Sequence, residues 1–99
     1  MRSVWQISKL TEKRDVDSPT IICERRDYGC INTVETEEEA LKYLSGLAER
    51  AKKKGWRCSL DKATLALSVH YCDSDYVVMY FSTERVIGHG KIPFKAKSL

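Results

Sequence analysis

The chain of 99 residues contains no long apolar run. A membrane-spanning helix needs about 20 consecutive, mainly apolar residues, and no stretch approaches that length. The first residues, Met1 to Gln6, also lack the apolar core of a secretory signal. Together these absences predict an intracellular, cytoplasmic protein with no membrane partner.

Motifs that mark an enzyme are missing as well. The sequence has no nucleophile elbow, no H-E-x-x-H and no phosphate-binding glycine loop. None of its cysteines, Cys23, Cys30, Cys58 and Cys72, forms a C-x-x-C pair, and we expect free thiols rather than two disulfides. We therefore expect no cofactor and no metal. His70 lies two residues before Cys72, a spacing that makes a weak zinc site.

Length and composition predict one domain with a single modest core, since 42% of the residues are hydrophobic. We place it at residues 1–90 and expect the basic segment 91–99 to be a loosely ordered tail. The net charge of +3 is uneven, because residues 1–39 carry 6 basic and 9 acidic groups whereas residues 40–99 carry 11 and 5. This asymmetry permits an anionic partner for the C-terminal part without requiring one.

The clearest local pattern predicts a helix over residues 37–54. Thr36 and Glu39 have the spacing of a capping box. Glutamates fill the first turn and cations the last, as the helix dipole favours, and Gly55 follows as the expected left-handed residue. Apolar residues recur at helical spacing between these ends. Gly46, inside the helix, suggests a close packing contact.

The rest of the chain predicts strands that bury the apolar helix stripe. Segment 11–19 is expected to be a loop, and Asp27-Tyr28-Gly29 and Thr83-Glu84-Arg85 are expected to be turns. The fold class is two-layer α+β, with one helix on one face of a mainly antiparallel sheet of four to six strands. The expected strands are 4–10, 20–26, 57–60, 64–71 and 76–82, and the short segments 30–34 and 86–87 are further strand candidates.

Two of these strands form a hairpin whose register follows from burial. An odd loop of three or five residues pairs Leu67 with Phe81 and Val69 with Met79, so that both apolar sets share one face. A slip of one residue would expose a whole apolar set. The sequence leaves open whether the N-terminal strands join this hairpin in one sheet.

The same register defines an amphipathic outer face, which is our first candidate site. It carries His70, Tyr76, Val78 and Tyr80. Tyrosine and histidine suit a surface that is buried only when a partner binds. We therefore predict a small non-catalytic binding module that contacts another protein, or a second copy, through this face or a sheet edge. Accessory, immunity and phage-inhibitor proteins are often of this kind.

Two alternatives remain. Cations next to an aromatic ring suit phosphate contact with stacking, so a nucleic-acid-binding protein is the second hypothesis. A small enzyme centred on His70 and Cys72 is the third. The residues of the nucleic-acid hypothesis are Lys52, Lys53, Lys54, Trp56 and Arg57, together with the basic tail.

Overall fold

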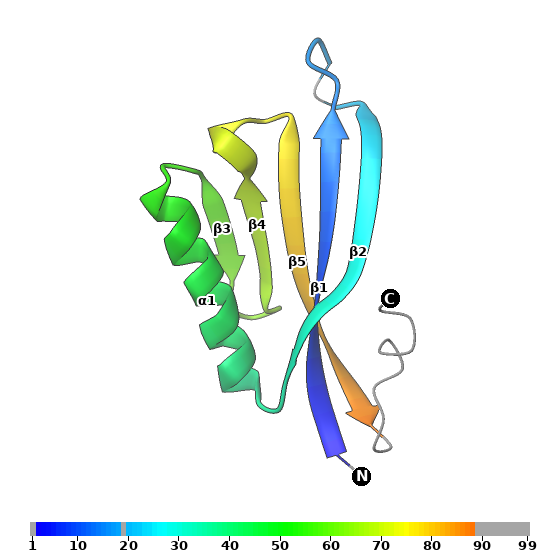
Figure 1. Ribbon diagram of the computed structural model, residues 1–99, viewed down its shortest axis with the longest axis vertical. Helices are drawn as coiled ribbons and strands as arrows, with labels where there is room; N and C mark the ends of the chain where they lie inside the picture. Colours follow the sequence, from blue (N-terminus) through cyan, green and yellow to red (C-terminus); the bar gives the residue numbers. More distant parts are fainter. Residues whose placement is uncertain (1, 19, 89–99) are drawn as a thin grey trace.

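The computed structural model describes residues 2–18 and 20–88. In these ranges one α-helix packs on one face of a five-stranded antiparallel sheet, which confirms the predicted two-layer α+β fold (Figure 1). The predicted tail at 91–99 lies outside the described residues. The elements are β1 (Arg2–Arg14), β2 (Ile22–Val34), α1 (Glu37–Lys53), β3 (Cys58–Asp61), β4 (Ala66–His70), the short 3-10 helix η1 (Tyr71–Asp73) and β5 (Val77–Gly88).

The sheet order is β2-β1-β5-β4-β3. Strand β1 pairs with β5 along its whole length, from Arg2 opposite Gly88 to Lys13 opposite Val77. The N-terminal strands and the C-terminal hairpin therefore belong to one sheet. Helix α1 packs over β3 and β4, whereas β1, β2 and part of β5 continue past it (Figure 1).

Helix α1 forms as predicted, because its signals are local. The backbone N–H of Glu39 donates to Thr36 Oγ1 at 3.1 Å, and that of Thr36 donates to Glu39 Oε1 at 3.1 Å. At the other end Gly55 has φ +81°, and the N–H of Trp56 donates to the carbonyl of Ala51 at 3.0 Å. These bonds make a Schellman ending. The helix ends at Lys53, one residue before the predicted end, with Lys54 as C-cap.

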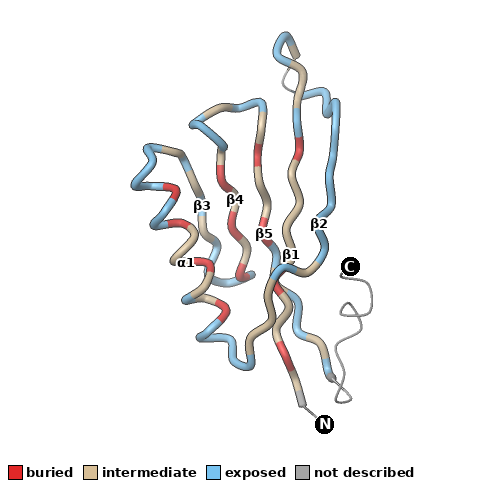
Figure 2. The backbone as a smooth tube through the Cα atoms, viewed as in Figure 1, coloured by how far each residue is buried: buried red, intermediate tan, exposed pale blue. Residues whose placement is uncertain are grey.

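The core lies between α1 and the β1, β4 and β5 side chains that face it. Its largest fully buried side chains are Ile7, Leu44 and Leu67. Figure 2 shows buried positions on α1 and on the strands behind it, whereas β2 is exposed along most of its length. The predicted close packing at Gly46 is wrong, because a Cβ there would meet nothing within 4 Å.

The hairpin register is confirmed. Leu67 pairs with Phe81, Val69 with Met79 and His70 with Val78. The connection is longer than the predicted three or five residues, because the ladder ends at His70 and the chain enters η1 at Tyr71. Cys72 and Asp73 in η1 both have positive φ, at 55° and 56°.

Three other predictions are wrong, all in the long strands. Residues 11–14 continue β1 rather than starting a loop. The segment Asp27-Tyr28-Gly29 is not a turn between two strands but a bulge inside β2, where the Gly29 N–H donates to Asp27 Oδ1 at 2.8 Å and the β1–β2 register shifts. Residues 83–85 are not a turn either, because β5 runs unbroken beside β1. Cross-strand pairing thus overrides local turn chemistry at each place.

Candidate functional site

The predicted outer face lies on the side of the sheet away from α1. Pairing of Ser68 with Tyr80 and of His70 with Val78 puts these residues on one face. Val78, however, is only 3% exposed, so it offers no contact surface in this protomer. Tyr76 is exposed, whereas His70 and Tyr80 are half-buried. The imidazole Nδ1 of His70 lies 3.1 Å from the Ser74 carbonyl oxygen.

An ion network around the buried Glu12 lies on that face, where Glu12 pairs with Val78 across β1 and β5. Glu12 is 7% exposed and accepts hydrogen bonds from Arg14 Nη2 at 3.1 Å and from Arg25 Nη2 at 3.0 Å. Arg14 Nη2 also donates to the Tyr80 hydroxyl at 3.1 Å. Burial raises the pKa of Glu12, but the hydrogen bonds and charges of the two arginines outweigh burial, and the pKa is lowered. Glu12, Arg14 and Tyr80 on this face therefore already have hydrogen-bond partners within the chain.

The two sheet edges are poor templates for a further strand. Edge strand β2 carries charges from Glu24 to Asp27, and its pairing with β1 shifts register three times. The other edge, β3, has four residues. Short, bulged and charged edges resist strand addition, so the edge version of the protein-contact hypothesis gains no support from this geometry.

The basic residues at the end of α1 divide into two groups. Lys54 Nζ lies 4.7 Å from the Trp56 ring centroid, and the Trp56 ring lies 4.9 Å from that of Tyr71. Arg57 is instead bound within the chain, to Asp73 at 2.6 Å and to Asp75 at 2.7 Å. The hydrogen bond and charge of Arg57 lower the pKa of Asp75.

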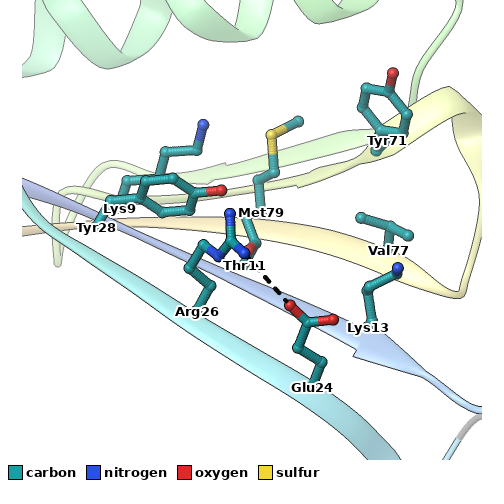
Figure 3. Close-up of a pocket in the computed structure, with 9 residues that line it drawn as sticks. All are labelled: Lys9, Thr11, Lys13, Glu24, Arg26, Tyr28, Tyr71, Val77 and Met79. Atoms are coloured by element: carbon teal, nitrogen blue, oxygen red, sulfur yellow. Dashed lines mark ion pairs between the residues drawn. The ribbon is translucent and has the colours of Figure 1, made fainter.

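On the helix side of the sheet, two adjoining hollows form what we call the basic trough. Both include Lys9, Tyr71 and Met79. The first hollow, of about 340 Å³, lies over β1, β2 and β5, and Figure 3 shows Tyr28 and Tyr71 on opposite sides of it with Met79 between them. The second, of about 310 Å³, continues beside the C-terminal half of α1. The other lining residues are Thr11, Lys13, Glu24, Arg26, Tyr28 and Val77 in the first hollow, and Leu47, Arg50, Ala51, Lys54, Trp56, Val69 and Phe81 in the second.

The trough is strongly positive. Among residues 2–18 and 20–88, its lining includes five cations, Lys9, Lys13, Arg26, Arg50 and Lys54, and one carboxylate, Glu24. Glu24 lies 3.9 Å from Arg26 (Figure 3). The glutamates of the first helical turn lie roughly 16–26 Å along α1 from Arg50 and Lys54, beyond the screening length of about 8 Å at physiological salt. They therefore do little to cancel the local charge.

The surroundings of the Tyr28 side chain are positively charged as well. Lys9 Nζ lies 4.7 Å and Arg26 Cζ 6.0 Å from its ring centroid. A hydrogen bond with Arg26, a second with Thr11 and the nearby positive charges lower the pKa of the Tyr28 hydroxyl. An anionic group entering this hollow would meet the same donors and charges.

Sequence reasoning found only part of this site. It named Lys54 and Trp56, which line the trough, but also Lys52 and Lys53, which do not. It missed the strand residues on the trough floor. The alternation of Lys9, Thr11 and Lys13, and that of Glu24, Arg26 and Tyr28, was the available signal, because period two places each set on one strand face.

Comparison with known proteins supplies no further assignment: no family model, curated protein or solved structure matches the chain. Residues 2–18 and 20–88 contain no helix long and apolar enough to cross a membrane. The same described ranges contain no group of three or more histidine, cysteine, aspartate or glutamate side chains arranged to hold a metal ion.

Proposed function

We propose that this chain is a small non-catalytic binding module that holds a polyanionic partner in the basic trough. The observation that carries this proposal is the ratio of five cations to one carboxylate along two adjoining hollows. Cations spread over two hollows suit a partner with several separated negative charges better than one small anion. A concave surface of one sign also raises the rate at which oppositely charged partners arrive.

The enzyme hypothesis has less support. The trough lining among the described residues includes no histidine and no cysteine. His70 is engaged by the Ser74 carbonyl oxygen and lies 3.8 Å from Asp75, within its own turn. Cys72 is exposed in the same turn. A nucleophile paired with an oriented base, as covalent catalysis needs, is not among these contacts.

The test compares two charge-reversed variants with equal net charge. The trough variant is K9E/R26E/K54E, and the control is K42E/K53E/K62E, whose lysines are exposed outside the trough. Binding to immobilised heparin and to fluorescent poly-glutamate is measured against salt, with far-UV circular dichroism to check folding. We expect the trough variant to lose at least tenfold in affinity and the control less than twofold. Equal losses, or no binding by the wild-type chain, would contradict the proposal.

Contact with another protein, or with a second copy, is the second candidate function. Val16, Ile21 and Ile22 are 65%, 53% and 42% exposed. They lie at or next to the β1–β2 connection, which projects from one end of the sheet (Figure 1). Exposed apolar clusters commonly mark interaction sites. Sedimentation velocity should show self-association that V16E/I21E abolishes and T20E, at an exposed polar position, preserves; a wild-type monomer at all concentrations would exclude self-association.

A further inference from the structure

The side chains around the trough combine flat aromatic rings with cations. Tyr28 and Tyr71 are each 46% exposed although each touches other side chains. They lie on opposite sides of the first hollow, with Met79 between them (Figure 3). Ring faces beside a row of cations are the arrangement that single-strand binders use, with bases on the rings and phosphates on the cations.

We infer that the partner in the basic trough is a single-stranded nucleic acid whose bases stack on Tyr28 and Tyr71 while its phosphates contact the surrounding lysines and arginines. This inference rests on the proposed function and gives its ligand class. An acidic peptide would satisfy the cations but present no ring to stack. A duplex would present phosphates while keeping its bases stacked inside.

The position of the Tyr71 ring is restricted by contacts within the chain. Its ring packs against Trp56 at a centroid distance of 4.9 Å with the planes tilted by 56°. The following turn, with left-handed Cys72 and Asp73, is tied to Arg57 through Asp73 and Asp75. A ring fixed before binding loses little conformational freedom when a base stacks on it.

Tyr28 works differently, because Lys9 lies over its ring at 4.7 Å. A base that stacks on that face takes the place of the ammonium group, which then becomes free to pair with a neighbouring phosphate. The exchange keeps the ring covered and supplies one more phosphate contact. Arg26, 6.0 Å from the same ring, is a second donor at this position.

The experiment uses fluorescence anisotropy with the full chain and three labelled probes: a mixed-sequence 12-nucleotide single strand, its 12-base-pair duplex and a 12-residue poly-glutamate. The wild type should prefer the single strand, with a log–log salt slope of about −3 if four phosphates are contacted. Y28A/Y71A should weaken single-strand binding by at least tenfold, since stacking contributes roughly 5- to 150-fold per base. Y28F/Y71F should retain it. Y76A, at an exposed tyrosine outside the trough, is the matched control.

The outcomes separate this inference from the proposed function. If all three probes bind alike and Y28A/Y71A binds as well as wild type, the trough holds polyanions but not through stacking, and the inference fails alone. If no probe binds, both fail. Photocrosslinking of wild type to a 5-bromouracil single strand needs no variant to fold: attachment at Tyr28 or Tyr71 supports the inference, and attachment only elsewhere overturns it.

Discussion

Replacing Glu12 by alanine should destabilise the protein by about 2 kcal/mol. The carboxylate is 7% exposed and accepts from two arginines at 3.1 and 3.0 Å. Charge-assisted hydrogen bonds contribute roughly 1.5–3 kcal/mol each. The exposed Arg25 side chain regains water when Glu12 is lost, and alanine also removes the desolvation cost of a buried carboxylate. Both effects reduce the sum. Part of the destabilisation remains, because Arg14 loses a hydrogen-bond partner while its buried Nε already has none.

The measurement is urea unfolding followed by tryptophan fluorescence, since Trp5 and Trp56 both pack against the core. A loss of about 2 kcal/mol corresponds to a fall in Tm of roughly 8–16 °C for a domain of this size. The matched control is E24A, on the neighbouring strand. Glu24 is exposed and lies 3.9 Å from Arg26, and an exposed pair of this kind contributes at most about 1 kcal/mol.

The comparison decides whether the Glu12 network stabilises the sheet. If E12A and E24A lower the unfolding free energy by the same amount, the buried carboxylate contributes no more than a surface charge. The denaturant m-value should stay unchanged, because the same surface is exposed on unfolding. A lower m-value would mean that E12A alters the native or the denatured state, and the loss of stability could then not be assigned to the contacts of Glu12.

Three further results are expected. G46A should stabilise the protein by about 0.5–1 kcal/mol in urea unfolding, because a Cβ at Gly46 meets nothing; a loss of stability would reveal a contact. G55A should destabilise it by about 1–2 kcal/mol in the same assay, because Gly55 has φ +81°; equal stability would mean that the helix end relaxes. The folded-state pKa of Glu12 lies below its ordinary value of 4.5, so its contribution is complete above that pH and is lost as pH falls through the folded-state pKa. The stability difference between wild type and E12Q should therefore shrink on acidification, and a pH-independent difference would contradict the assignment.

The helix could be predicted because its determinants are adjacent in sequence. The cap, the charged end turns and the closing glycine act within a few residues of one another. The hairpin register followed from burial alone, since one slip exposes every apolar residue of a strand. Neither prediction needed the order of the strands in the sheet.

The long strands could not be predicted in the same way. Residues 11–14 look like a loop because they are polar. They form strand because they pair with β2 and, up to Lys13, with β5 as well, and Glu12 accepts a hydrogen bond from Arg25 across the β1–β2 pair. Asp27-Tyr28-Gly29 suits a turn and a bulge equally well, and only the pairing with β1 selects the bulge. The basic trough depends on β2, β1 and β5 being neighbours. That adjacency is a property of the sheet order, which no local pattern contains.

The central position of β5 has a consequence for biosynthesis. Trp5 pairs with Arg85, 80 positions later in the chain. Strand β1 therefore cannot pair with β5 until nearly all of the described chain has left the ribosome. Until then the emerging β1–β2 hairpin has an open side. Such non-local closure slows folding, and unpaired strand edges at this stage invite aggregation. Chaperone demand during translation should therefore peak just before residues 77–88 emerge.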